Sequence, residues 1–566
     1  MTPARTGLRE GVRAATEETW MAECQGRPPV QVLGTRGMVS SMHPTASQIG
    51  ADILKAGGNA VDAGVAVGAA ISVLSPDWAG PAGDSAWLLY LRDSGTYRYL
   101  DGYTTCPAAI SPERIAAHFD LDQRTDRRAY EEEPPEQRHV GMITGMVPGT
   151  PAAWCELAQR HGTMPLPALV EPAIDLAERG FPVNRYLAVA VKANRAKLHR
   201  FSSSRAVWFD AGGTEVGEAA VLRQPELADT LRRLAAGGQD GFYKGETAAA
   251  IVEHAQRQGG VVTLEDLGAY RAVWREVLRG TYRGRDIVVT SPPTAGVHVL
   301  QALNILEGYP FAELPFHGTQ SVHLMIEALK LALADRRAVG GDPDFLPMNT
   351  ASLADKVYAA ELRSRIDEKR ATPRGTAQFA APSTTHFAVV DGKGNMVSAT
   401  QTLGSRFGCG DTVPGTGLLM NDRTWWMFLG PGANQVAPGH RANIGHAATM
   451  VAEGGVPVAT LGSPGGFGIV QYMVQVVSHM IDSGLDIQRA IEAPRFKIEH
   501  LRGRVGFERR FDAAMRSALA DMGHEVFEFP EWSDRVGGVE GVSVDPATGV
   551  MLGGYDPRRN SLAVGL

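Results

Sequence analysis

Apolar residues recur along the chain with two different spacings, and each spacing predicts a different kind of element. A spacing of three to four residues predicts helices at 46–74, 151–161, 219–234, 245–258, 296–308, 321–339 and 468–482. Short alternating or β-branched runs predict strands at 86–91, 286–290, 384–390, 396–402, 456–461 and 504–507. The Gly57-Gly58 pair divides the first helical stretch into at least two elements. Helices and strands mixed over the whole length predict an α/β (α+β) protein.

The strands at 384–390 and 396–402 are predicted to form a hairpin, because only a short Gly/Asn turn separates them. If Lys393 lies at the centre of the turn, antiparallel partners have numbers that sum to 786 (2 × 393). Thr402 then lies opposite Thr384, and the two side chains share one face of the sheet, about 5 Å apart at Cβ. The pattern therefore holds two hydroxyl groups side by side, one of them at the very start of a strand.

This pair of hydroxyls suits a nucleophile that needs a neighbour to orient it. A threonine hydroxyl also needs a base, and at a chain terminus the free α-amino group, whose pKa is about 8, can take its proton. Thr384 is internal as encoded, so the hypothesis requires cleavage of the backbone after Ser383. The preceding Ala371–Ser383 segment is rich in Ala, Pro and Thr, without periodicity, as expected of a flexible tether. The plain alternative is a hairpin in which paired threonines only stabilise the sheet.

Composition and charge limit the classes of function that the chain could have. With 44% hydrophobic and 21% charged residues, the 566-residue chain is typical of a globular protein, and a net charge of −7 does not favour a nucleic-acid surface. Its four cysteines and scattered histidines lack metal-ligand spacing, so we expect no metal and no organic cofactor. The N-terminal Met1–Trp20 lacks a secretory pattern, and Val61–Leu74 is too short to span a bilayer. These features predict a cytoplasmic protein that is not bound to a membrane.

Short motifs from one end of the chain to the other resemble those of the gamma-glutamyltransferase (gamma-glutamyltranspeptidase) family of N-terminal nucleophile hydrolases. Each motif is weakly specific, but their order and spacing together are specific. They are Gly37-Met38-Val39-Ser40-Ser41, Leu54–Ala63 with its Gly-Gly-Asn-Ala core, Val147-Pro148-Gly149-Thr150, Val262–Leu267, Thr384-Thr385-His386, Phe407-Gly408, Pro414–Gly417, Leu461–Gly466 and Asp556-Pro557-Arg558-Arg559.

The resemblance implies a four-layer αββα sandwich, made from one precursor that is cut into a large subunit, 1–383, and a small subunit, 384–566, which stay associated. It implies that Thr384 is the nucleophile and that Thr402 hydrogen-bonds and positions it. It also implies that Gly465 and Gly466 supply the backbone N–H donors of an oxyanion hole, a role that glycine suits because no Cβ obstructs the approach. Without the surrounding motif, Gly465-Gly466 could equally be a plain turn. His386 belongs to the motif, and we interpret it as a hydrogen-bonded core histidine.

The substrate pocket departs from the pattern of glutamyl-processing members of the family. Tyr103 replaces the arginine that grips the substrate carboxylate, and Ile444-Gly445 replace a pair of serines. Trp426 falls near the position of the acidic residue that pairs with the α-amine, and Gly404 replaces an asparagine. Binding a zwitterion requires opposite charges at fixed places. These differences therefore predict weak binding of gamma-glutamyl compounds.

Other residues near the same motifs could hold a different substrate. Arg423 could bind a carboxylate through its planar guanidinium, and Arg406 and His446 are further candidates, although a surface ion pair explains them equally well. Trp425, Trp426 and Tyr103 would make the pocket more aromatic, which suits a cyclic or bulkier apolar substrate; ordinary packing of the paired tryptophans is the alternative.

The resemblance leaves several functions open. A small-molecule acyl substrate could be transferred or hydrolysed as a gamma-glutamyl compound, as another acyl amide, or through carbon–carbon bond hydrolysis of the kind found in alkylproline biosynthesis. From a different class, the chain could be an uncleaved binding scaffold without chemistry. The intact set of Thr384, Thr402, Gly465 and Gly466 argues against the scaffold.

Overall fold

The structure is a computed structural model that describes residues 30–119, 139–346, 349–372, 384–499 and 503–566. The predictions for Met1–Trp20, for Cys24 and for residues 373–383 of the tether lie outside the described part of the chain.

Two seven-stranded sheets form the centre of the molecule. The nucleophile sheet, named for the strand that follows Thr384, comprises in order β21 (Leu562–Gly565), β2 (Gly37–Ser41), β10 (Thr385–Asp391), β11 (Met396–Thr402), β3 (Asp84–Leu91), β4 (Thr96–Gly102) and β7 (Val273–Arg275). The second sheet comprises β1 (Val32–Gly34), β20 (Met551–Gly554), β19 (Glu540–Val544), β15 (Val456–Gly462), β14 (Thr449–Glu453), β9 (Arg285–Val289) and β8 (Leu278–Tyr282).

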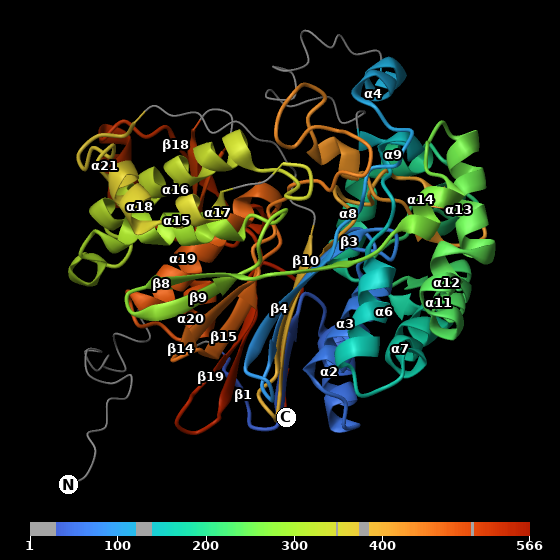
Figure 1. The fold of residues 1–566 in the computed structure, drawn as a ribbon, viewed down its shortest axis with the longest axis horizontal. Coiled ribbons are helices and arrows are strands. Elements are labelled where there is room, and N and C mark those ends of the chain that lie inside the picture. Colours follow the sequence, from blue (N-terminus) through green and yellow to red (C-terminus); the bar gives the residue numbers. More distant parts are fainter. Residues whose placement is uncertain (1–29, 120–138, 347–348, 373–383, 500–502) are drawn as a thin grey trace.

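The two sheets lie face to face, and helices cover both outer faces (Figure 1). Met38 and Val390 of the nucleophile sheet pack against Met450 and Val542 of the second sheet in the inner core. The helices over the nucleophile sheet are α2 (Pro44–Lys55), α3 (Ala60–Leu74), α6 (Thr150–His161), α7 (Leu166–Arg179), α11 (Pro225–Gly237), α12 (Gln239–Tyr243) and α13 (Gly245–Arg257). Those over the second sheet are α15 (Gly296–Glu307), α16 (Thr319–Val339), α18 (Lys356–Arg363), α19 (Ile469–Ile481), α20 (Ile487–Glu492) and α21 (Ala513–Asp521). The predicted αββα sandwich is confirmed.

Smaller elements complete the described chain. They are α4 (Pro112–Phe119), α8 (Arg185–Ala193), α9 (Arg195–His199), α10 (Ser202–Trp208), α14 (Leu264–Ala269), α17 (Thr350–Leu353), the pairs β5 (Phe181–Pro182) with β6 (Val221–Leu222) and β12 (Thr412–Val413) with β13 (Leu418–Leu419), and the sheet of β16 (Phe496–Ile498), β17 (Val505–Glu508) and β18 (Val526–Phe529).

One carboxylate fixes both the central hairpin and the helix packed behind it. Asp391 ends β10, and its side chain accepts hydrogen bonds from the backbone N–H groups of Lys393, Asn395 and Ala60. It therefore shapes the turn into β11 and holds the first residue of α3. The helix itself is buried over its full length, as its apolar sequence predicts.

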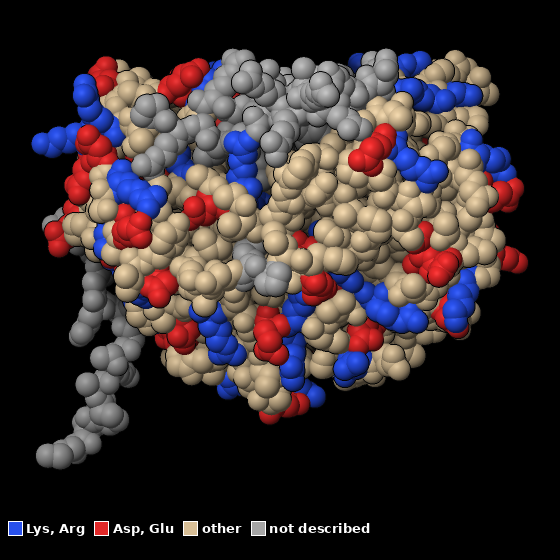
Figure 2. All heavy atoms as spheres, turned by 45° about the horizontal axis from the view of Figure 1, so that its top comes forward, with Lys and Arg blue, Asp and Glu red and all other residues tan. Residues whose placement is uncertain are grey.

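The predicted elements are found with small shifts at their ends, and one helix starts later than expected. The helix predicted from residue 219 begins at Pro225, because Val221–Leu222 pair instead with Phe181–Pro182 as a short sheet. Cys106, Cys155 and Cys409 are buried free thiols. Among the described residues, no helix is long and apolar enough to cross a membrane. On the face shown in Figure 2, acidic and basic side chains are intermingled.

Candidate active site

The hairpin lies in the middle of the nucleophile sheet, and its register agrees with the prediction. Thr385 pairs with Gln401 and His386 pairs with Thr400, so that the partner numbers sum to 786 (385 + 401; 386 + 400). Thr384 directly precedes β10, and the same register continued by one residue places it opposite Thr402. Both threonines are buried, with 2% and 1% of their surface exposed.

The residues just after β11 explain one departure from the family pattern. The backbone N–H of Gly404 donates a hydrogen bond of 2.9 Å to Oγ1 of Thr402. Gly404 has a φ of 109°, and a Cβ there would lie 1.9 Å from Oδ1 of Asp422. That oxygen already accepts a hydrogen bond from the N–H of Ser405. An asparagine cannot occupy position 404 in this conformation, because the Asp422 carboxylate fills its space.

His386 is a core histidine, as we interpreted it. It is fully buried, with Nδ1 2.9 Å from Oγ1 of Thr400 and Nε2 3.3 Å from Oγ of Ser398. Burial lowers its pKa to about 3, so the ring is neutral at physiological pH. It fills the space beside Gly462, where a Cβ would lie 2.2 Å from the ring.

The Gly465-Gly466 pair lies between the end of β15 and the start of α19. Both residues have positive φ values, 130° and 57°, which favour glycine. The first N–H groups of a helix have no partner within it and carry the positive end of its dipole, which suits a developing oxyanion. Gly445 passes so close that its Cβ would lie 1.8 Å from the carbonyl oxygen of Gly466. A serine at position 445 would therefore displace the glycine pair.

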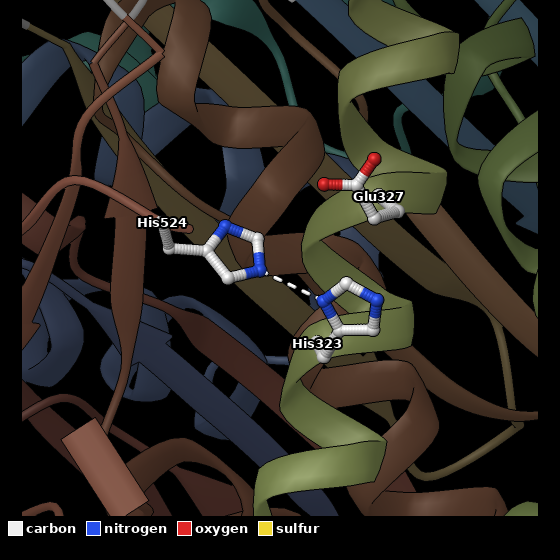
Figure 3. A group of neighbouring side chains, drawn as sticks. All are labelled: His323, Glu327 and His524. Carbon is white, nitrogen blue, oxygen red and sulfur yellow. Dashed lines mark hydrogen bonds between the residues drawn. The ribbon is translucent and has the colours of Figure 1, made fainter. Parts of the chain in front are cut away.

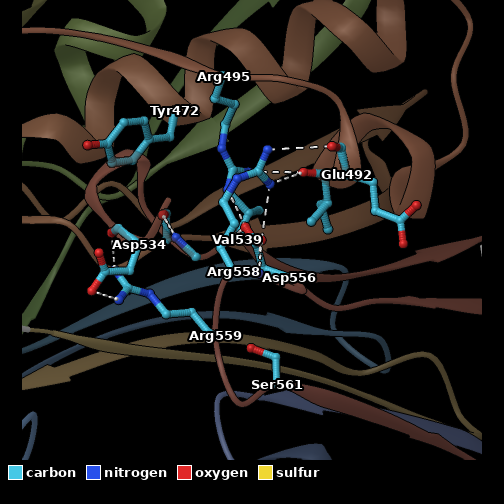
Figure 4. A network of polar contacts seen from close by, with 12 residues as sticks. Tyr472, Glu492, Arg495, Asp534, Val539, Asp556, Arg558, Arg559 and Ser561 are labelled. Atoms are coloured by element: carbon cyan, nitrogen blue, oxygen red, sulfur yellow. Dashed lines mark hydrogen bonds and ion pairs between the residues drawn. The ribbon is translucent and has the colours of Figure 1, made fainter. Parts of the chain in front are cut away.

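A buried ionic network lies beside Tyr472, and the Arg495 guanidinium is 6.0 Å from the centre of the Tyr472 ring (Figure 4). Arg495 and Arg558 both pair with Asp556, and all three side chains are closed to solvent. Burial alone would raise the pKa of Asp556, but the two guanidinium groups hold it at about 2. The ring of Tyr472 packs against Gly465, where a Cβ would lie 2.6 Å away. The network therefore connects the C-terminal motif, Asp556–Arg559, through Arg495 and Tyr472 to the proposed oxyanion hole.

The fold brings together Tyr103 and His446, two of the predicted pocket residues. The Tyr103 hydroxyl lies 2.9 Å from Nδ1 of His446, and both side chains are almost fully buried. Burial raises the pKa of Tyr103 well above 10 and lowers the pKa of His446 well below 6.5, an effect that the nearby Arg423 reinforces for His446. The pair is therefore neutral at physiological pH.

Arg423 reaches the same region but already has a carboxylate partner. Its Nε lies 2.6 Å from Oδ2 of Asp84, in a contact too poorly aligned for a hydrogen bond, and its guanidinium lies 5.2 Å from the centre of the Trp426 ring. Burial raises the pKa of Asp84 to about 7, although the positive charge of Arg423 opposes the shift. Asp84 is also the partner of Thr402 across β3 and β11. The pair therefore borders the proposed nucleophile.

Three residues of this region were not predicted. Asp84 stands at the start of an apolar strand, where a charge is unusual, and that was its only signal. Phe467 directly follows the glycine pair and packs 5.2 Å from Trp426. Arg336 continues the buried face of α16, where the pattern calls for an apolar residue.

One cluster of potential metal ligands lies elsewhere, between α16 and the segment after α21 (Figure 3). His323 and His524 share a hydrogen bond of 2.8 Å, and Glu327 pairs with Lys330 at 2.8 Å. A cation there would have to break the imidazole contact and face the Lys330 ammonium. The cluster therefore fits a hydrogen-bonded network better than a metal centre.

Fold and hairpin together define an N-terminal nucleophile hydrolase, an enzyme whose nucleophile is a threonine in this family. The chain belongs to the gamma-glutamyltranspeptidase family, which it matches over residues 46–566. It is 37% identical over 528 residues to the Acylase ACY 1 proenzyme of Pseudomonas sp. (strain SE83), with 92% of each chain covered. It is 34% identical over 547 residues to the Glutathione hydrolase proenzyme of Escherichia coli (strain K12), covering 93% of this chain and 91% of the relative. The crystal structure of cephalosporin acylase from Bacillus halodurans matches with a TM-score of 0.84 and 32% identity, over 95% of this chain and 97% of that one.

Proposed function

We propose that the chain is a self-processing acylase that cleaves itself between Ser383 and Thr384 and then hydrolyses or transfers a small acyl group. The hairpin register supports this proposal most strongly, because it brings Thr402 opposite Thr384 at the start of β10. The relatives named proenzymes support the processing step.

Cleavage frees the α-amine of Thr384, which takes the proton from the Thr384 hydroxyl as the oxygen attacks a substrate carbonyl. The N–H groups of Gly465 and Gly466 then stabilise the negative oxygen of the tetrahedral intermediate. The intermediate collapses to an acyl-enzyme, with the proton passing to the leaving group, and water or an amine accepts the acyl group. Thr402 orients the nucleophile throughout.

The two products of cleavage, 1–383 and 384–566, would stay together for a structural reason. The hairpin of β10 and β11 lies between β2 and β3, which come from the large subunit. Separation would break strand pairing on both sides of the hairpin.

The substrate we propose carries a carboxylate but lacks the α-amine of a gamma-glutamyl compound. Tyr103, His446, Gly404, Gly445 and Trp426 themselves carry no pair of opposite charges with which to bind the two ends of a zwitterion. Arg423 would contribute positive charge near the substrate, partly balanced by Asp84. Relatives named acylases support an acyl group as the part of the substrate that is transferred or hydrolysed.

Carbon–carbon bond hydrolysis is the second candidate. The rings of Tyr103, Trp426 and Phe467 belong to one buried cluster, which would suit a cyclic acid better than a linear amide. Both candidates use the same acyl-enzyme chemistry and differ only in the bond that breaks.

The test compares gamma-glutamyl-4-nitroanilide with glutaryl-4-nitroanilide, which has the same chain length but no α-amine. We expect kcat/KM to be roughly 10²- to 10³-fold lower for the gamma-glutamyl compound, since its ammonium group would be buried without a partner. Thr384→Ala serves as the inactive control. Equal or faster gamma-glutamyl turnover would refute the substrate assignment and indicate ordinary glutathione chemistry.

A further inference from the structure

A second arginine at the candidate site, Arg336, has no partner for its charge among the residues that the structure describes. Arg336, near the C-terminal end of α16, has only 1% of its surface exposed. Its Nε, Nη1 and Nη2 atoms make no hydrogen bond, and no carboxylate of the described chain forms an ion pair with it. Burial lowers its pKa to about 9, with Tyr103 opposing the shift, so the guanidinium stays protonated at neutral pH.

A buried guanidinium without a partner destabilises the folded state. An ionised side chain closed off from water destabilises a protein by several kcal/mol unless a counter-charge and hydrogen bonds replace its hydration. The other fully buried arginines of the chain follow this rule. Arg495 and Arg558, for example, share the carboxylate of Asp556. Arg336 is the exception, and a bound anion would remove its penalty.

The surroundings of Arg336 place it at the proposed active site. Its guanidinium lies 4.4 Å from the centre of the Phe467 ring, and Phe467 follows directly after Gly465-Gly466. Its positive charge also lowers the pKa of His446, the partner of Tyr103. The third neighbour is the buried His298 of α15, whose Nε2 has no hydrogen-bond partner. Arg336 therefore lies against the residue that follows the glycine pair, and the unpaired Nε2 of His298 is near Arg336.

We propose that Arg336 binds a carboxylate of the substrate, in a subsite between Phe467 and the Tyr103–His446 pair. This inference rests on the proposed acylase function and adds the residue that would determine its specificity. Arg336 suits this role better than Arg423, because Asp84 already balances the charge of Arg423. The planar guanidinium can donate two parallel hydrogen bonds to a carboxylate, which an ammonium cannot.

Three chromogenic amides locate the carboxylate that Arg336 would recognise. Glutaryl-4-nitroanilide carries it on the acyl chain, pentanoyl-3-carboxy-4-nitroanilide carries it on the leaving group, and pentanoyl-4-nitroanilide lacks it. For Arg336→Gln we expect kcat/KM to fall at least about 30-fold on one of the two acids and by less than about 3-fold on the neutral amide. The acid that is affected identifies the side of the scissile bond on which the subsite lies. Arg336→Lys should recover only part of the loss. The exposed Arg179, changed to Gln, is the control for loss of a positive charge.

Two further measurements separate a binding role from a structural one. The Tm of Arg336→Gln in thermal unfolding should be no lower than that of the wild type, because the variant removes an unpaired buried charge. Calorimetric titration of the purified enzyme with glutarate and with pentanoate should show tighter binding of glutarate, and this preference should vanish in Arg336→Gln if the subsite lies on the acyl side.

Equal losses on all three amides, or unchanged kinetics on both acids, would overturn the inference while leaving the acylase proposal intact. Absence of turnover by the wild type on every amide would instead count against the proposed function. In that case binding of two pairs of compounds, glutarate against pentanoate and 5-amino-2-nitrobenzoate against 4-nitroaniline, still decides whether Arg336 binds a carboxylate. A preference for the acid of either pair that is lost in Arg336→Gln supports the inference, and no such preference in either pair overturns it.

Discussion

Replacing Thr402 by valine should distinguish the catalytic role of this residue from its contribution to the stability of the protein. Valine keeps the shape of threonine and loses only the hydroxyl. Thr402 is 1% exposed, and its Oγ1 accepts the N–H of Gly404 at 2.9 Å, so the variant leaves one buried donor unsatisfied. That loss costs about 1–3 kcal/mol of unfolding free energy, which a folded 566-residue protein can tolerate.

Thr402→Val should also lose activity, for a separate reason. A hydrogen bond that positions a nucleophile typically contributes roughly 10²-fold or more to the rate. We therefore expect kcat/KM of Thr402→Val on glutaryl-4-nitroanilide to fall by about that factor, with a similar KM. Thr402→Ser keeps the oxygen and should stay within about 10-fold of wild type.

Thr400 provides a matched control on the same face of the same strand. Its Oγ1 contacts His386 at 2.9 Å, so Thr400→Val also loses a buried hydrogen bond but leaves the nucleophile untouched. Its thermal stability should fall as in Thr402→Val, while its activity should stay near wild type. The assay needs intact-mass measurement of each sample, so that slow maturation is distinguished from slow turnover. A folded, fully processed Thr402→Val enzyme with wild-type kinetics would refute the positioning role.

Two other predictions concern buried charges. Arg423→Gln should raise KM for carboxylate substrates without preventing cleavage. Asp84→Asn should lower stability by about 3–5 kcal/mol, because it leaves the Arg423 guanidinium buried without a counter-charge, whereas Arg423→Gln should lower it less, since the Asp84 carboxyl, whose pKa is already raised to about 7, then binds a proton. The double variant should recover most of the loss of Asp84→Asn, and additive effects in a double-mutant cycle would contradict the pairing. The pKa of Asp556 in the folded state is about 2, below its ordinary value of 3.8, so the ionised carboxylate stabilises the fold. This contribution, roughly 2–3 kcal/mol, is fully present above pH 4 and is lost as the pH falls toward 2. Denaturant unfolding should therefore show Asp556→Asn less stable than wild type at pH 7, with the difference shrinking at pH 3; a constant difference would argue against the ionic network.

Local sequence patterns predicted the elements that depend on short-range periodicity. The hairpin register followed from the position of Lys393 in its turn, because neighbouring strands pair with a fixed sum of residue numbers. The buried α3 followed from its continuous apolar run. Position 225 was missed as a helix start, because the preceding residues pair with a distant strand that local patterns do not reveal.

Contacts between segments that are distant in the sequence determine which charged side chains lie at the candidate site, and local sequence patterns do not predict these contacts. Nothing in the sequence indicates that Asp84 pairs with Arg423, or that Arg336 lies beside Phe467 with no charged partner in the described part of the chain. The resemblance to a family identified the positions where charges were missing. It did not identify the buried charges that this chain carries instead.

Intact-mass measurement with N-terminal sequencing of the purified, active protein tests whether Thr384 is a terminal nucleophile. We predict two associated chains of 383 and 183 residues (566 − 383 = 183), the smaller beginning with Thr384, whereas Thr384→Ala remains one inactive chain. An active wild-type protein that retains its full length of 566 residues would contradict the proposed mechanism.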